Sequence, residues 1–387
     1  MKVLVNGVPL LSPLTGIGQY IRHLFAAIDR MQLAEVYMHY GLSIEKGIHL
    51  PSERTAHTLS RVNALAQRFV PYPRTARRLA EKAMFAYQTK FALRDALYHE
   101  PNYVPMPFDG PLVLTICDMS CFDHPETHPI ERVRLMQSEM PKALDRADHI
   151  LVISESSGRA LQRWFDVPSK KITTTYLAAD ARFRPYEPGA LAEPLAELNL
   201  SEGGYVLCVG TLEPRKNLTT LFAAYAALPA ALRHQYPLVV AGMSGWNTQE
   251  LMTSAQTLIE KGELRLLGYV PDALIPPLYA GAAAFCYPSR YEGFGLPPLE
   301  AMASGVPVLT ANQTSLPEVV GDAGLMVAPD DVDGMRESLR QMLEDRVFAQ
   351  ALGLRGLERA KKFNWERCAQ ETVGVYKQVM RDRGRVA

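Results

Sequence analysis

The sequence predicts an α/β protein of two doubly wound, Rossmann-like domains that face a cleft. The chain has 387 residues, of which 48% are hydrophobic, so it is too long for one ordinary core but can fill two. Short runs rich in Val, Ile and Leu alternate with longer amphipathic stretches, as in parallel strands joined by crossover helices. The alternation stops once near the middle of the chain and then resumes, which indicates two successive domains.

The first half contains four strand candidates separated by helices. They are residues 2–6, 35–40, 112–117 and 149–153. We expect them to form an N-terminal domain over residues 1–180. Residues 181–202 carry repeated prolines and a paired glycine, and we expect them to link the two domains.

The second half restarts the same pattern. Its strand candidates are residues 205–210, 238–241, 264–268, 283–287 and 306–310. They predict a C-terminal domain over residues 203–363. The amphipathic tail 364–387 is expected to be helical. It packs either on the C-terminal domain or, by crossing back, on the N-terminal domain.

Composition excludes several classes of protein. The 41 basic and 41 acidic residues balance, so no overall field attracts nucleic acid. The five cysteines are odd in number and scattered, which fits a reducing cytoplasm and no zinc site. No stretch reaches the roughly 20 apolar residues of a membrane span, so we expect a cytoplasmic protein. The basic stretch 61–94 fits either a solvated helix face or peripheral contact with an anionic membrane.

A basic pair follows the first strand of the second half. After Gly210 the chain reads TLEPRKN and enters a helical pattern near Leu218, so Arg215 and Lys216 lie between a strand and a helix. A helix N-terminus presents unpaired N–H groups, and Arg and Lys add a bidentate fork and a point charge. The combination suits a diphosphate, whereas PRK alone would indicate only a solvated loop.

A glycine-rich turn with two glutamates follows the fourth strand of the second half. Gly293 and Gly295 permit close approach of a ligand to the backbone, and the next two prolines suit the first turn of a helix. Glu292 precedes this helix and Glu300 lies inside it, so the two carboxylates can reach opposite ends of one extended ligand. Carboxylates accept paired hydrogen bonds from vicinal hydroxyls, which favours a sugar or a ribose as that ligand.

These residues resemble glycosyltransferase family 4, whose members have the GT-B fold and carry Glu-x7-Glu after an Arg-Lys pair. The likeness covers nearly the whole chain, including GYVPDALIPPLYAGA and SLPEVVGDAGLMVAPDD in the family's order. It implies that Arg215 and Lys216 clamp the diphosphate of a nucleotide-sugar donor, that Glu300 binds ribose, and that Glu292 contacts the transferred sugar. The donor-binding residues it implies are Gly16, Gly18, Gly210, Arg215, Lys216, Tyr269, Val270, Glu292, Gly293, Phe294, Gly295, Leu296 and Glu300.

The resemblance also assigns an acceptor side to the N-terminal domain. Gly16 and Gly18 lie where the loop after the first strand meets a helix. Many members of the family have a His-Asp pair where this chain has Cys117 and Asp118, so a changed sugar contact, compensation by another histidine and reduced activity remain open. We assign Cys117 to packing. His99 serves either the core or the acceptor side. Further acceptor-side candidates are Asn102 and His124.

No metal and no other cofactor is expected. Asp331 and Asp333 superficially match the acidic pair of metal-dependent glycosyltransferases, but they open a helix, where acidic residues favour the positive dipole end. The prolines of HPETHP argue against a helix that would bring His124 and His128 onto one face.

The resemblance implies a retaining hexosyltransferase in which the leaving diphosphate helps to remove the acceptor's proton. Its catalytic residues would be Arg215, Lys216, Glu292 and Asp118. We expect a GDP-linked mannose or rhamnose as donor and a glycan or lipid-linked acceptor in bacterial lipopolysaccharide or another surface polysaccharide. A sugar-nucleotide epimerase of the same fold and a catalytically silent sugar-nucleotide-binding protein remain open.

Overall fold

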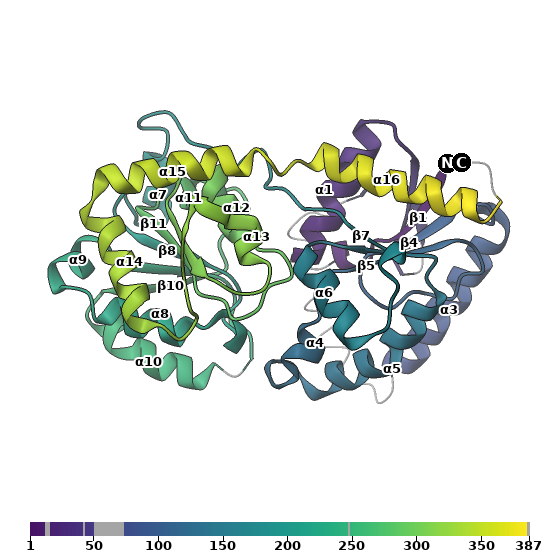
Figure 1. Cartoon of the computed structure of the whole chain (residues 1–387), viewed down its shortest axis with the longest axis horizontal. Helices are drawn as coiled ribbons and strands as arrows, with labels where there is room; N and C mark the ends of the chain where they lie inside the picture. Colours follow the sequence, from purple (N-terminus) through teal and green to yellow (C-terminus); the bar gives the residue numbers. More distant parts are fainter. Residues whose placement is uncertain (12–15, 42, 50–72, 247, 385–387) are drawn as a thin grey trace. The chain divides into compact units, whose positions relative to one another are not determined.

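The described chain forms two compact units. The computed structural model describes residues 1–11, 16–41, 43–49, 73–246 and 248–384. One unit contains Met1–Leu177 together with Asn364–Ala387, and the other contains Ala178–Phe363 (Figure 1).

The first unit is built on a seven-stranded sheet in the order β3-β2-β1-β4-β5-β6-β7. β3 pairs with β2 in antiparallel register and the other neighbouring strands pair in parallel. All residues of β4, β5 and β6 are buried, which explains their continuous rather than alternating apolar pattern. The strands are β1 (Lys2–Asn6), β2 (Glu35–His39), β3 (Ile44–Lys46), β4 (Leu97–Glu100), β5 (Leu112–Ile116), β6 (His149–Val152) and β7 (Ile172–Thr174).

The C-terminal helix belongs to this first unit. α16 packs beside α1, and the rings of His23 and Trp365 stack at 5.3 Å between their centroids (Figure 1). The tail 364–387 therefore returns to the domain in which the chain begins. The helices of the unit are α1 (Gly16–Arg30), α3 (Pro73–Ala92), α4 (Ser120–Asp123), α5 (Ile130–Arg146), α6 (Glu155–Trp164) and α16 (Trp365–Asp382), with short 3₁₀ turns η1 (Val8–Leu11), η2 (Pro125–Thr127) and η3 (Ser169–Lys171).

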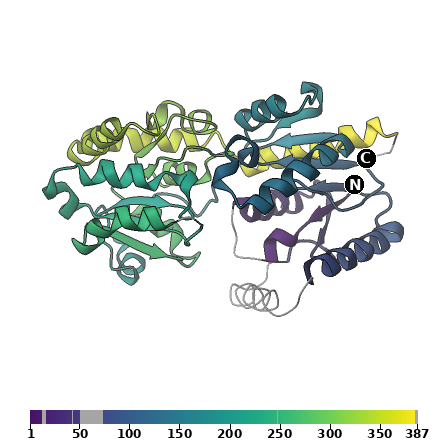
Figure 2. The same ribbon diagram turned by 90° about the horizontal axis from the view of Figure 1, so that it is seen from below.

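The second unit is built on a six-stranded parallel sheet in the order β10-β9-β8-β11-β12-β13. The strands are β8 (Val206–Val209), β9 (Leu238–Ala241), β10 (Leu264–Gly268), β11 (Ala284–Tyr287), β12 (Val308–Ala311) and β13 (Leu325–Val327). Helices cover both faces of the sheet (Figure 2). α8 packs against α10 and α14, and α12 packs against α15.

Short helices fill the remaining connections of the second unit. The helices are α7 (Ala192–Glu197), α8 (Leu218–Ala226), α9 (Ala230–Gln235), α10 (Gln249–Glu260), α11 (Ile275–Ala280), α12 (Leu296–Ala303), α13 (Leu316–Val320), α14 (Val332–Glu344) and α15 (Arg346–Ala360), with 3₁₀ turns η4 (Pro214–Lys216) and η5 (Gly321–Ala323). Residues 181–202, which we expected to link the domains, are part of this unit. Leu191 and Leu195 are buried and α7 packs on α11, so the segment has a core contact that its prolines and glycines conceal.

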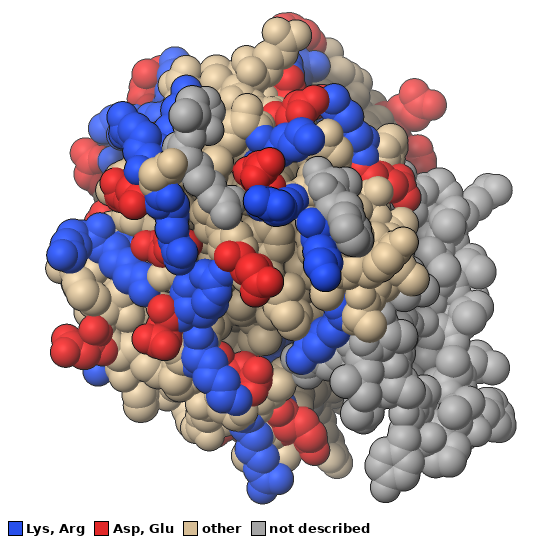
Figure 3. All heavy atoms as spheres, turned by 90° about the vertical axis from the view of Figure 1, so that its right-hand side faces the viewer, with Lys and Arg blue, Asp and Glu red and all other residues tan. Residues whose placement is uncertain are grey.

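The surface expected to meet a membrane is described only in part. Residues 61–72 of the basic stretch lie outside the described residues. The following helix α3 exposes Met84 and Tyr87, which are 41% and 69% accessible. The face of the molecule in Figure 3 carries Lys and Arg interspersed with Asp and Glu rather than a field of one sign. No helix within the described ranges combines the length and the apolar character needed to cross a bilayer.

Candidate active site

The basic pair and the glycine-rich turn meet at one edge of the second sheet. β8 and β11 are neighbours, although the chain first extends the sheet through β9 and β10 and only then returns to β11. Such a reversal leaves a crevice at the carboxyl ends of the two strands, where ligands of doubly wound sheets bind. The loop after β8 carries Arg215 and Lys216, and the loop after β11 carries Glu292.

Both cations form ion pairs with Glu292. Arg215 Nη1 lies 3.0 Å from Glu292 Oε2, and Lys216 Nζ lies 2.7 Å from Glu292 Oε1. Arg215 also contacts Glu213, with Nη2 donating to Oε1 at 2.6 Å. Two positive and two negative side chains therefore form one buried cluster that joins the two loops.

Lys216 keeps hydrogen-bonding capacity for a ligand. The ammonium has three donors, and two of them have partners in the described chain, Glu292 and the Tyr287 hydroxyl, which lies 2.6 Å from Nζ. Burial of Lys216 and the neighbouring Arg215 charge lower its pKa, whereas the pairing with Glu292 opposes this change. A phosphate oxygen would supply both a third acceptor and a further negative charge.

Glu292 is held in its ionised form. Burial alone would raise its pKa, but the charges of Arg215 and Lys216 and hydrogen bonds from Lys216 and Ser289 lower the pKa to about 2. Both carboxylate oxygens are engaged by cations. This arrangement suits a fixed acceptor of sugar hydroxyls better than a nucleophile, since a nucleophile needs a free lone pair directed at the anomeric carbon.

The backbone of the turn after β11 is fixed by neighbouring side chains. Glu292 N donates to Thr314 Oγ1 at 3.0 Å, and Ser315 Oγ donates to the Glu292 carbonyl at 2.9 Å. Gly295 precedes α12 with φ of 114°, a conformation that favours glycine. Its Cα also approaches Leu316 so closely that an added Cβ would lie 3.0 Å from Leu316 Cδ2. The neighbouring Gly293 and Phe294 are buried, and α12 begins at Leu296 with the two prolines in its first turn, as predicted for them.

Gly210, Tyr269, Val270 and Glu300 lie on the same unit, whereas the donor candidates Gly16 and Gly18 belong to the first unit. Gly210 directly follows β8 and lies against the aliphatic part of Lys216. Glu300 lies within α12 and is partly exposed, and burial of its carboxyl raises its pKa to about 7. Tyr269 and Val270 follow β10 at the carboxyl edge of the sheet, where Tyr269 is 46% exposed and Val270 is buried.

The first sheet has its own reversal between β1 and β4. Asn6 ends β1 and donates through Nδ2 to both carboxylate oxygens of Glu100 at 3.0 Å. Glu100 ends β4 and also accepts from the Tyr98 hydroxyl at 2.6 Å and from Asn102 N at 2.9 Å. Burial raises the pKa of Glu100 to about 7. Sequence reasoning singled out its neighbours and missed this carboxyl, although a glutamate before a proline at a strand end was a usable signal.

Asp118 lies at the carboxyl edge of β5, as predicted. Its Oδ1 accepts from Ser120 N at 2.9 Å and from Ser120 Oγ at 2.7 Å, and Ser120 Oγ lies 2.8 Å from His128 Nε2. The Cys117 thiol is buried and its pKa is raised, which supports its assignment to packing. His124 N donates to the Ser120 carbonyl at 2.8 Å, and His124 Nδ1 lies 3.2 Å from Glu126 Oε1.

His99 is a core residue, so its assignment to the acceptor side is wrong. Its side chain is 0% exposed, its Nδ1 lies 2.6 Å from the Tyr376 hydroxyl, and its Nε2 lies 2.7 Å from Thr115 Oγ1. Burial lowers the pKa of His99 to about 3, so the ring is neutral at physiological pH. Both ring nitrogens are used to join β4, β5 and α16.

Gly16 and Gly18 form the first turn of α1 in the first unit.

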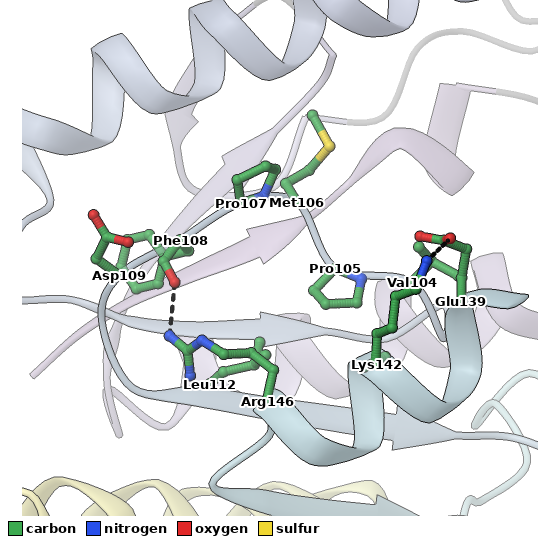
Figure 4. A pocket seen from close by; sticks show the side chains of 11 residues that line it. Val104, Pro105, Met106, Pro107, Phe108, Asp109, Leu112, Glu139, Lys142 and Arg146 are labelled. Atoms are coloured by element: carbon green, nitrogen blue, oxygen red, sulfur yellow. Dashed lines mark hydrogen bonds and ion pairs between the residues drawn. The ribbon is translucent and has the colours of Figure 1, made fainter.

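A cavity of about 300 Å³ lies elsewhere on the first unit. It is bounded by the loop 104–109 and by α5, where Arg146 donates to the Phe108 carbonyl and Lys142 pairs with Glu139 (Figure 4). Leu112, the first residue of β5, also lines it, so the cavity lies at the amino end of that strand. None of the predicted site residues contributes to its wall.

The acidic and sulfur-containing residues of the described chain form no metal-binding group. No cluster of three or more His, Cys, Asp or Glu side chains suited to a metal occurs among the described residues. Asp331 caps α14, with its carboxylate accepting from Gly334 N at 2.8 Å, as the dipole argument predicts. All five cysteines are buried and unpaired by disulfides.

Known proteins resemble this chain in sequence and in fold. Residues 196–359 match the family model of group 1 glycosyl transferases. The O-antigen chain mannosyltransferase B of Escherichia coli is 40% identical over 383 residues, which cover 97% of this chain and all of that protein.

Solved structures agree in fold. WaaG, a glycosyltransferase involved in lipopolysaccharide biosynthesis, has a TM-score of 0.71 at 17% identity and covers 97% of this chain and 99% of its own. Anabaena Alr3699/HepE, solved with UDP and glucose, has a TM-score of 0.72 at 18% identity, and the match covers 98% of this chain and 100% of that chain. The two Rossmann-like units thus have the GT-B architecture. This chain belongs to the group 1 glycosyltransferases and is an enzyme of that class.

Proposed function

We propose that this enzyme transfers mannose, or the related hexose rhamnose, from a GDP-sugar to a glycan or lipid-linked acceptor during synthesis of a bacterial surface polysaccharide. The observation that carries the proposal is the cluster of Arg215, Lys216 and Glu292 at the reversal of the second sheet. The mannosyltransferase of O-antigen chains that matches the full chain supports the choice of sugar and of product.

The chemistry follows from what this cluster can stabilise. In the transfer, the acceptor oxygen forms a bond with the anomeric carbon while the bond from that carbon to the diphosphate breaks. The electron pair of the broken bond leaves with the nucleotide diphosphate, and the acceptor's proton passes to a diphosphate oxygen. Arg215 and Lys216 would bind the departing charge, which is the part of the reaction where preorganised cations contribute most.

Retention of the anomeric configuration is part of the proposal. Attack from the face of the leaving group needs no protein nucleophile, and the fully engaged Glu292 carboxylate is suited to orienting the sugar. Asp118, which is fixed by Ser120, is the proposed polar group of the acceptor side. We propose that the enzyme binds the donor without a metal.

A cytoplasmic location is supported by the five buried cysteines, none of which forms a disulfide. For a lipid-linked acceptor, the described surface that would meet the inner membrane is α3, where Met84 and Tyr87 are exposed beside Lys90.

The test is donor turnover with a panel of GDP-mannose, GDP-rhamnose and UDP-glucose, with and without an O-polysaccharide fragment as acceptor. Acceptor-dependent release of GDP in the presence of EDTA, with an α-linked product from the α-linked donor by NMR, is the expected result. Conversion of the donor without acceptor would identify an epimerase. Donor binding with no release under any condition would identify a silent sugar-nucleotide-binding protein.

A further inference from the structure

Arg182 joins two acidic residues from distant parts of the second unit. Its Nε lies 2.9 Å from Asp180 Oδ2, and its Nη1 and Nη2 lie 2.7 Å and 3.3 Å from the two carboxylate oxygens of Asp272. This is the bidentate geometry for which guanidinium is suited. Asp272 belongs to the loop after β10 that carries Tyr269 and Val270. The fork therefore fixes that loop to the segment that opens the unit.

The same three charges act on Glu300. After burial, which raises the pKa of Glu300 most, the Tyr279 hydroxyl lowers it, the negative charges of Asp180 and Asp272 raise it, and Arg182 lowers it. Arg182 thus offsets part of the effect that the two aspartates have on the Glu300 carboxyl. Among the described residues, these are the charged groups with the largest effects on the Glu300 carboxyl.

We propose that Arg182 is a positioning residue for the nucleoside of the donor, because it holds the loop after β10 through Asp272 and offsets the two aspartates beside Glu300. The inference rests on the proposed function, and it takes Glu300 as the acceptor of the ribose hydroxyls, as the family resemblance implies. The ionised carboxylate offers one acceptor oxygen to each of two vicinal hydroxyls, whereas the protonated carboxyl presents an O–H donor at one of these two positions. Donor binding is therefore linked to a proton, and Arg182 sets the pH at which the linkage acts.

The proton linkage has a calculable size. If the Glu300 carboxyl ionises with a midpoint near pH 7 and its protonated form binds no donor, affinity for the donor falls about tenfold between pH 8 and pH 6. GDP-mannose is the suitable probe because neither of its phosphates takes up a proton in that interval. Glu300→Gln should make the affinity weak and independent of pH.

The experiment measures the affinity of the full chain for GDP-mannose by calorimetry between pH 5.5 and 8.5. Arg182→Gln is expected to move the midpoint to higher pH and, because Asp272 no longer holds the loop after β10, to weaken binding at the upper end of the range as well. Asp180→Asn is expected to move the midpoint to lower pH. A merely structural role for Arg182 would weaken binding equally at every pH. Arg340→Gln, which removes the same charge from a surface pair on α14, should leave the midpoint unchanged.

Two outcomes distinguish a failure of this inference from a failure of the proposed function. Failure of the wild type to bind either GDP-mannose or UDP-glucose would overturn the proposed function, and this inference with it. If the wild type binds only UDP-glucose, the same series is run with that donor. Binding of a donor with one midpoint shared by wild type, Arg182→Gln and Asp180→Asn would refute the role of Arg182 and leave the proposed function standing.

Discussion

Glu292→Gln should destabilise the second unit by several kcal/mol while leaving its shape intact. The pKa of the Glu292 carboxyl falls from its usual 4.5 to about 2 in the folded protein. At 1.36 kcal/mol for each pH unit, this difference corresponds to roughly 3 kcal/mol in favour of the folded state above pH 4.5. Gln keeps the volume but leaves Arg215 and Lys216 with a neutral partner, and breaking a buried pair in this way typically costs about 3–5 kcal/mol.

The pH range of the effect follows from the direction of the pKa change. Because the folded-state pKa is lowered, the stabilisation is complete above the unfolded value of 4.5 and is lost as the pH falls toward 2. Between pH 5 and pH 8 the deficit of the variant should therefore be constant.

Scanning calorimetry of wild type and variant measures the deficit directly. For a unit of this size, a loss of about 3 kcal/mol lowers the melting temperature of its transition by roughly 6–12 °C. Glu358→Gln is the matched control, since Glu358 pairs with Lys361 on the exposed surface of α15 in the same unit. An unchanged transition in Glu292→Gln, or a deficit that grows between pH 5 and pH 8, would refute the reasoning.

Three further substitutions test other parts of the site. Arg215→Ala should lower kcat by about 100- to 1000-fold, because it removes a donor to the leaving diphosphate, and near-normal steady-state transfer would count against the clamp. The raised pKa of Glu100, about 7, means that its contribution to stability is complete below pH 4.5 and is lost as the pH rises through 7. The free energy of unfolding of the first unit should therefore fall less between pH 5 and pH 8 in Glu100→Gln than in wild type, by up to about 3 kcal/mol. Equal decreases in the two proteins would contradict the buried carboxyl. Gly295→Ala should destabilise the turn before α12 by roughly 1–2 kcal/mol in urea unfolding, because of its φ of 114° and the approach of Leu316, and a neutral effect would show that the turn relaxes.

The long buried strands and the donor loops could be predicted from the sequence. Strands such as β1 and β9 have the predicted bounds, because a strand buried on both faces is a continuous apolar run between turn residues. α8 begins at the predicted Leu218.

Other features depend on contacts that local sequence does not encode. β4 is buried throughout, yet two of its four residues are His99 and Glu100, and their burial is possible only because partners such as Tyr376 and Asn6 lie far along the chain. The same holds for Arg182 and Asp272, which are separated by 90 positions. Hydrogen bonds of this kind decide whether a polar residue belongs to the core or binds a ligand.

The placement of α16 also affects how the chain is made. The first unit is completed by the last helix, whose Tyr376 is fully buried against His99. During synthesis, the second unit therefore has all of its residues before the first does, so the earliest strands of the chain await their final partner while the second unit can already fold. An expression fragment that ends at residue 363 would carry an intact second unit and an opened first one.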